Sequence, residues 1–117
     1  MNVLVVDGDV GAGIDTTGVL SADHTVRFVR SVAEARSAIK DVRPEAVVCE
    51  LSLAGRDGGD VLLSWLRTFD PAVRRIVFCN GISPTGFDVD LAHAWVFKPD
   101  VQKVEWLLRE GAVPRAT

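Results

Sequence analysis

Five charged or polar residues stand where short apolar runs of the chain end. Asp7 and Asp9 follow the first run, Glu50 ends the third, and Asn80 and Lys98 follow the fourth and fifth. Carboxylates grouped in this way suit a hard divalent cation such as Mg²⁺, and a lysine opposite them can hold a phosphate or carboxylate oxygen. Each residue alone could be ordinary polar punctuation, but the ordered set predicts one polar site, with Asp7, Asp9 and Glu50 as candidate Mg²⁺ ligands.

The apolar runs predict five strands that alternate with longer amphipathic stretches. The runs are Val3 to Val6, Val26 to Val29, Ala46 to Leu51, Ile76 to Cys79 and Ala94 to Phe97. This alternation is typical of an α/β protein with a parallel sheet and helices on both faces. In such a sheet, functional groups gather beyond the carboxyl ends of the strands. The five polar residues are therefore expected to lie together.

Two helices are clearly marked. The sequence from Ser31 to Glu34 is a capping box, and helical spacing of apolar residues continues to Val42, before Arg43-Pro44. The stretch from Gly59 to Phe69 places five apolar residues on one side of a second helix. These are Val61, Leu62, Trp65, Leu66 and Phe69. Trp65 is thus expected in the core rather than on a binding surface.

Of the three remaining helical segments, the first two are less regular. The segment after the first strand contains several glycines, so packing must hold its helix. Residues 81–93 include Pro84 and show poor periodicity, which predicts a short or irregular fourth helix. The last helix is predicted from Val101 to Glu110, capped by Asp100 and ended by Gly111. Opposite its apolar stripe lies Trp106, which is expected to be exposed.

Length and composition predict one globular domain. The 117 residues are 48% hydrophobic and 25% charged, which favours a single domain over residues 1–111 followed by a tail at 112–117. The net charge of −3 and the absence of a basic stripe argue against nucleic-acid binding. No apolar stretch approaches a membrane span, so a cytoplasmic location without membrane contact is expected. Cys49 and Cys79 lie in apolar runs and are expected to be buried, reduced thiols.

The chain resembles the receiver domain of bacterial two-component response regulators over nearly its whole length. The matching segments are VLVVD at residues 3 to 7, an acidic position just after, ELSLAGRDG at 50 to 58 and AWVFKP at 94 to 99. The resemblance implies a CheY-like, flavodoxin-like fold, a doubly wound five-stranded sheet of order 2-1-3-4-5. In that family an aspartate at the end of the third strand accepts a phosphoryl group with the help of Mg²⁺.

Three of the five central chemical positions depart from the family. Glu50 stands at the phosphoacceptor, Gly8 at a carboxylate that usually binds Mg²⁺, and Asn80 at a hydroxyl residue that contacts the phosphate. Asp7 and Lys98 match the first acidic residue and the lysine.

The resemblance assigns three further positions. Gly81 matches the small residue after the hydroxyl position, and Trp95 matches the aromatic residue whose orientation reports the switch. Ala54 replaces the usual proline of the loop after the acceptor.

These departures together argue against ordinary phosphorylation. The extra methylene of Glu50 displaces its carboxylate by about 1 to 1.5 Å, enough to cost on the order of 100-fold in phosphoryl transfer. No cofactor is expected, and Mg²⁺ binding is expected to be weak at most. Two interpretations stay open. Glu50, Asn80 and Lys98 form a permanent polar linkage that imitates part of the phosphorylated state, or the site has decayed and Lys98 only neutralises nearby carboxylates.

The expected function is that of an atypical single-domain receiver that acts in signal transduction through phosphorylation-independent protein–protein contact, and not as an enzyme. The expected partner is another signalling protein, such as a kinase, a regulator, or a cytoskeletal or motility component. Trp95 and Trp106 are the candidate interface anchors. The resemblance implies docking or homodimer formation through the face of the fourth helix, fifth strand and last helix.

Two alternative functions remain. The first is a phosphate-accepting receiver of a phosphorelay, with an unusual Mg²⁺ site and Asp57 as another acceptor, although Asp57 is better explained as a cap or turn residue. The second is a small-molecule-binding domain of flavodoxin-like shape. Against it, Gly8, Gly11 and Gly13 do not form a phosphate-binding loop.

Overall fold

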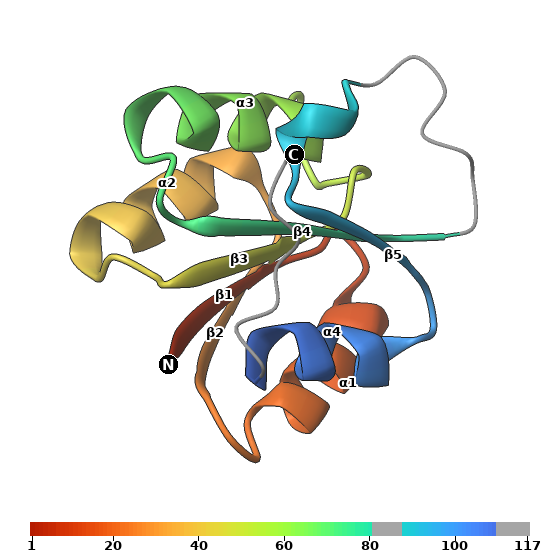
Figure 1. Ribbon diagram of the computed structural model, residues 1–117. Helices are drawn as coiled ribbons and strands as arrows, with labels where there is room; N and C mark the ends of the chain where they lie inside the picture. Colours follow the sequence, from red (N-terminus) through yellow and green to blue (C-terminus); the bar gives the residue numbers. More distant parts are fainter. Residues whose placement is uncertain (81–87, 110–117) are drawn as a thin grey trace.

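A five-stranded parallel sheet of order β2-β1-β3-β4-β5 forms the centre of the molecule (Figure 1). The computed structural model describes residues 1–80 and 88–109. The strands are β1 (Asn2–Val6), β2 (Thr25–Val29), β3 (Ala46–Cys49), β4 (Arg74–Cys79) and β5 (Ala94–Phe97). The helices are α1 (Val10–Leu20), α2 (Val32–Asp41), α3 (Gly59–Phe69), the 3₁₀ helix η1 (Val89–Leu91) and α4 (Val101–Arg109). The predicted doubly wound fold and its strand order are confirmed.

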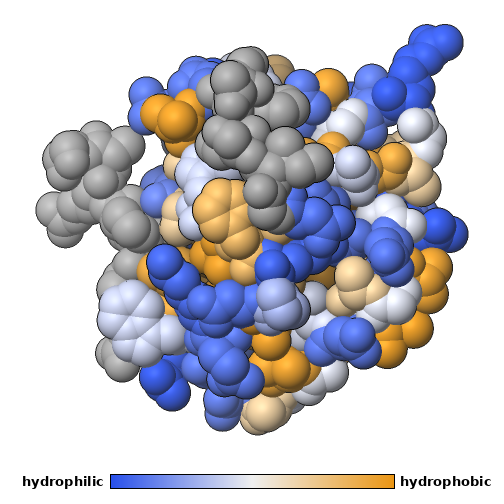
Figure 2. Space-filling model, turned by 90° about the vertical axis from the view of Figure 1, so that its right-hand side faces the viewer, coloured by the Kyte–Doolittle hydropathy of each residue, from blue (hydrophilic) through white to orange (hydrophobic). Residues whose placement is uncertain are grey.

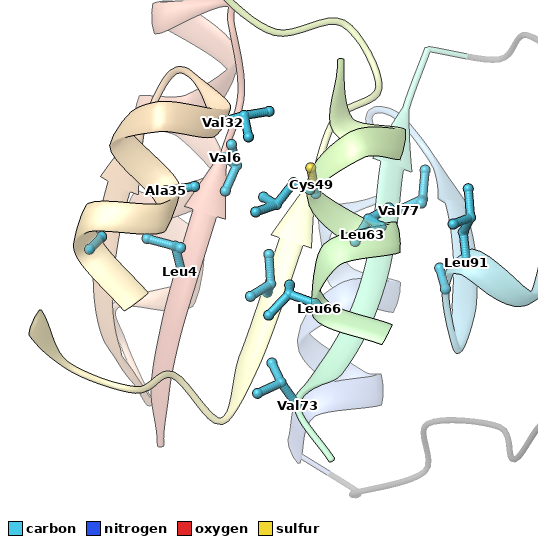
Figure 3. Close-up of a cluster of buried hydrophobic side chains, with 14 of the residues drawn as sticks. Leu4, Val6, Val32, Ala35, Cys49, Leu63, Leu66, Val73, Val77 and Leu91 are labelled. Carbon is cyan, nitrogen blue, oxygen red and sulfur yellow. The ribbon is translucent and has the colours of Figure 1, made fainter. Parts of the chain in front are cut away.

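The helices cover the sheet in two layers (Figure 1). Helices α2 and α3 lie together on one face, and α1 and α4 lie together on the other. The alternating side chains of the strands therefore enter two hydrophobic cores. Figure 3 shows Val32 and Ala35 of α2, with Leu63 and Leu66 of α3, above Leu4, Val6 and Val77 of the sheet.

Close packing explains the glycine-rich helix α1. A β-carbon at Gly13 would lie 2.2 Å from the ring of Phe28 on β2, so only glycine lets the helix approach the strand this closely. The helix starts at Asp9, whose carboxylate accepts a hydrogen bond from the backbone N–H of Ala12 at 3.2 Å. The helix predicted after the first strand is present and packs closely on β2, while the prediction that packing holds it stays a prediction.

The predicted caps of two other helices are present. The Ser31 hydroxyl accepts from the Glu34 N–H at 3.1 Å, and Asp100 accepts from the Lys103 N–H at 3.3 Å. The prediction for Asp57 as a cap is wrong, because Gly58 precedes α3 and makes no side-chain cap.

Two sequence-based predictions need correction, the end of β3 and the buried face of α3. Strand β3 ends at Cys49 rather than Leu51, because the backbone turns after it and the N–H groups of Leu51 and Ser52 face the Glu50 carboxylate. On α3, Leu62, Leu63 and Leu66 form the buried face. Val61 and Phe69 are exposed, whereas Trp65 is partly buried against the core, as predicted.

The described part of the chain before β5, residues 88–93, is irregular and contains one short helix. Residues 88–93 contain the single turn η1, and the buried Arg75 guanidinium donates to the carbonyl of Leu91 at 2.9 Å. His93 accepts through Nδ1 from the backbone N–H of Arg75 at 3.0 Å. Predictions for Gly81, Pro84 and Gly111, for the helix end at Glu110 and for the tail 112–117, fall outside the described residues.

Two further sequence-based expectations can be compared with the described residues. Cys49 and Cys79 are buried free thiols, as expected, and burial raises the pKa of both. None of the helices in residues 1–80 and 88–109 is long and apolar enough to cross a bilayer.

Candidate functional site

Three charged side chains from three strands meet at the carboxyl edge of the sheet. The Lys98 ammonium lies 2.7 Å from Oδ2 of Asp7 and 2.9 Å from Oε2 of Glu50. Asp7 and Glu50 are only 4% and 7% exposed, and the Lys98 side chain is 12% exposed. We call these three residues the charged triad. Its formal charge is −1, because two carboxylates face one ammonium.

Parallel strand pairing places the triad. Asp7 and Glu50 follow β1 and β3, which pair in register from Val3 with Ala46 to Val6 with Cys49, so both carboxylates leave the sheet side by side. Lys98 follows β5, and its backbone N–H donates to the carbonyl of Cys79 at 2.7 Å. The topology thus brings together residues 91 positions apart in the chain.

Backbone donors hold the two carboxylates on the side away from Lys98. Oε1 of Glu50 accepts from the N–H of Leu51 at 2.8 Å, and Oδ1 of Asp7 accepts from the N–H of Asp9 at 2.9 Å. The contact of Lys98 with Asp7 is a hydrogen bond, whereas its contact with Glu50 is an ion pair without hydrogen-bond alignment. The Glu50 side chain therefore has one well-bonded oxygen and one that faces only the ammonium.

The charged neighbours of Lys98 favour the protonated form of its side chain. Burial by itself lowers the pKa of the ammonium, but the contacts with Asp7 and Glu50 outweigh burial and raise that pKa above its usual value. The stabilisation by this ion pairing is therefore present at neutral pH. It is lost only as the pH rises from about 10.4, the ordinary lysine value, through the raised pKa.

The predicted Mg²⁺ ligands do not assemble. Asp9 is exposed and its carboxylate caps α1, while the carboxylates of Asp7 and Glu50 already hold Lys98. Over residues 1–80 and 88–109, no three side chains of the types Asp, Glu, His or Cys are grouped to hold a metal ion. The residues present therefore do not fit the divalent cation that the family resemblance implies.

The loop after β3 closes the place where the second family carboxylate would stand. A β-carbon at Gly8 would lie 3.0 Å from backbone atoms of Ser52, Leu53 and Ala54. Arg30 fixes this arrangement, because its guanidinium donates to the Gly8 carbonyl at 2.8 Å and its carbonyl accepts from the Ala54 N–H at 2.9 Å. A side chain at position 8 would therefore require the loop at 52–54 to shift by a few tenths of an ångström.

The remaining predicted site residues are more dispersed. Asn80 lines the same cleft but makes no hydrogen bond to Glu50 or Lys98, so the expected linkage contains Asp7 in place of Asn80. Trp95 is half-buried, and its indole N–H donates to the carbonyl of Val89 at 3.0 Å. Trp106 is 46% exposed, as predicted. Asp57 is exposed and does not line the cleft.

The cleft above the triad has a volume of about 480 Å³. Its walls come from the ends of β1 and β3, the loop at 52–54, Asn80 and Arg30. Sequence reasoning missed Arg30, because its guanidinium reaches Gly8 across 22 positions of the chain and no local pattern marks that contact.

Comparison with known proteins gives matches among solved structures. The receiver domain of NtrX from Brucella abortus matches at 26% identity and TM-score 0.82, over 95% of this chain and 97% of that chain. In a longer NtrX structure the match has TM-score 0.81 and 26% identity, and covers 96% of this chain and 27% of that chain. A CheY-like receiver domain protein from Methanospirillum hungatei matches at 19% identity and TM-score 0.83, over 94% and 91% of the two chains.

No protein-family model matches the chain, and no curated protein matches it. The structural matches agree with the observed order of the strands in the sheet. The chain therefore has the fold of CheY-like response regulator receiver domains.

Proposed function

We propose that this chain is an atypical receiver module that transmits a signal by binding another signalling protein, without phosphorylation and without catalysis of its own. The observation that carries the proposal is the charged triad. Lys98 pairs with both Asp7 and Glu50 in the place where phosphoryl chemistry would need a free carboxylate and a divalent cation.

The loop around Gly8 supports the same proposal. Phosphoryl transfer depends on positioning and on neutralising the developing charge, and a metal does much of this work. Asp9 lines the cleft, but its carboxylate caps α1. Position 8 carries no carboxylate, and a β-carbon there would lie 3.0 Å from the backbone of the loop at 52–54. Asp57, the alternative acceptor, lies outside the cleft lining, so no described contact favours a phosphorelay function.

The ion pair of Lys98 with Glu50 also supports a constitutive state. In the proposed state, the Glu50 carboxylate pairs with Lys98 as a phosphoryl oxygen would. The carboxylate carries about one negative charge, whereas a phosphoryl group carries nearly two. The Asn80 amide is not part of this linkage, so the imitation is limited to the lysine contact.

The proposed output surface is the β5 and α4 side of the molecule, with Trp106 as its anchor. Figure 2 views the molecule from this side and shows hydrophobic residues as separate patches among hydrophilic ones. Trp106 is a large exposed aromatic, the residue type that most often dominates an interface, whereas the hydrogen-bonded Trp95 is less available. The surface is suited to another signalling protein or to a second copy of the chain.

An amide NMR titration with Mg²⁺, followed by beryllofluoride as a phosphoryl mimic, tests the closed site. We expect no shifts around Asp7, Glu50 and Lys98. A receiver domain with an aspartate acceptor, titrated in parallel, provides the positive control. Saturable, localised shifts in this chain would defeat the proposal and restore the phosphotransfer reading.

Two experiments on wild type and Trp106→Ala test the output surface. If the chain self-associates, sedimentation velocity measures the effect of the substitution on that association. If it does not, binding to an identified signalling partner is measured instead. We expect the substitution to weaken one of these interactions. If it weakens neither, Trp106 is not an interface anchor.

A further inference from the structure

A row of exposed and half-buried apolar side chains lies along α3. This helix is on the opposite face of the sheet from α4 (Figure 1). Val61, Trp65 and Phe69 are spaced four residues apart, so they share one flank of the helix. Phe69 is 71% exposed, the largest fraction among the exposed large hydrophobic residues that the structure describes. The rings of Trp65 and Phe69 are in contact, with centroids 5.9 Å apart. The row therefore extends over about two helical turns, or about 12 Å.

The neighbouring flank of α2 adds positive charge to this row. The Arg36 guanidinium lies 5.0 Å from the ring centroid of Trp65, which shows that this flank faces α3. Lys40 is exposed one turn further along the same flank. Lys40 makes no ion pair within the described residues, and the Arg36 guanidinium contacts the Trp65 ring.

Three carboxylates on or next to α2 and α3 are already engaged, and Asp60, in the first turn of α3, makes no ion pair with Arg36 or Lys40. Asp41 pairs with Arg27 at 3.0 Å, and Asp70 pairs with Arg43 at 2.6 Å. Glu34 accepts a hydrogen bond from the Arg30 N–H at 2.8 Å. Arg36 and Lys40 are therefore available to an external negative charge.

We infer that Arg36, Lys40, Val61, Trp65 and Phe69 form a docking surface, here called the α2–α3 surface, for an acidic amphipathic helix of a partner protein. A helix with its own apolar stripe can cover a row of this length, as in other helix-binding surfaces. Glutamate or aspartate residues on one flank of that helix would face Arg36 and Lys40. A nucleic acid fits poorly, because the surface has only two available cations and large exposed apolar groups.

This inference goes beyond the proposed function and does not depend on it. The α2–α3 surface contains no residue of the charged triad and lies across the sheet from Trp106. One module with two surfaces could hold two partners at once, or hold one partner while self-associated through the other surface.

The test uses a synthetic amphipathic peptide of about four helical turns, with Leu and Phe on one face and Glu on the flanks. We expect its addition to shift amide signals of α2 and α3 and the indole signal of Trp65. Lys40→Glu should weaken binding by about tenfold, and Phe69→Ser by at least about tenfold. Trp106→Ser, a matched aromatic substitution on the other surface, should change binding less than about twofold.

Three results would overturn the inference. They are the absence of peptide shifts on α2 and α3, equal binding of a peptide with Lys in place of Glu, and an equal loss of binding in Trp106→Ser. Because Lys40 and Phe69 are exposed, their variants are expected to keep the fold, which circular dichroism and thermal unfolding would verify. Failure here leaves the Mg²⁺ and beryllofluoride titration unaffected, so the two proposals fail separately.

Discussion

Lys98 and Glu50 form a buried ion pair at the carboxyl edge of the sheet, with Nζ and Oε2 2.9 Å apart. The same ammonium also holds Asp7 at 2.7 Å. One lysine thus supplies the positive charge that two buried carboxylates require. The charged triad thus joins the ends of β1, β3 and β5.

Replacing Lys98 by methionine should lower the free energy of unfolding by about 3 kcal/mol, because it leaves two buried carboxylates without their cation. Urea denaturation at pH 7.5 measures this loss. Lys103→Met, an exposed lysine on α4, is the control and should change stability by less than about 0.5 kcal/mol. An equally small effect at Lys98 would show that the triad is not a stabilising joint and would also count against the mimic interpretation.

Restoring the family's carboxylates should not restore a metal site. In the double variant Gly8→Asp, Glu50→Asp, the new β-carbon at position 8 lies 3.0 Å from the loop backbone, so the loop must shift by a few tenths of an ångström, against the contacts of Arg30 that hold it. We expect no saturable Mg²⁺ binding by calorimetry and a loss of about 1–3 kcal/mol in unfolding free energy. Glu50→Asp alone, which leaves the loop in place, is the control. Tight Mg²⁺ binding with undiminished stability in the double variant would contradict the closed-loop account.

Two glycines of α1 should respond in opposite directions to alanine. A β-carbon at Gly13 would overlap the Phe28 ring, whereas one at Gly18 meets no atom within 4 Å. Gly18→Ala should therefore raise the unfolding free energy by about 0.5–1 kcal/mol, since alanine favours a helix, and Gly13→Ala should lower it by about 1–3 kcal/mol. Thermal or urea unfolding of the pair measures both. Equal changes in unfolding free energy for the two variants would mean that α1 does not pack closely on β2.

The sequence was sufficient to predict the sheet and the meeting of Asp7, Glu50 and Lys98, because parallel strands must end at one edge and their terminal residues follow from the apolar runs. It was not sufficient to place Asp9 or Asn80. Whether a carboxylate caps a helix or faces a cleft depends on side-chain rotation, which no spacing pattern records.

Contacts between distant segments explain the other differences. The closure of Gly8 depends on a loop 44 to 46 positions away and on Arg30. On α3, helical periodicity grouped Val61 and Phe69 with the buried residues, since an apolar stripe has no marked edge in the sequence. How far α2 covers that stripe decides which residues are exposed, and this is a property of the packed helices.

The stability of the protein should fall on mild acidification because of His93. Burial and the charges of Arg75 and Arg74 lower the pKa of this imidazole, and its Nδ1 must stay unprotonated to accept from the Arg75 N–H. As the pH falls below about 6.5, the unfolded chain takes up a proton at this residue before the folded chain does, so the unfolded state is favoured. Urea midpoints at pH 7.5 and 5.5 should therefore differ in wild type. The difference should shrink in His93→Asn, whose amide oxygen can accept the same hydrogen bond without titrating. An unchanged difference in that variant would assign the acid sensitivity to other groups.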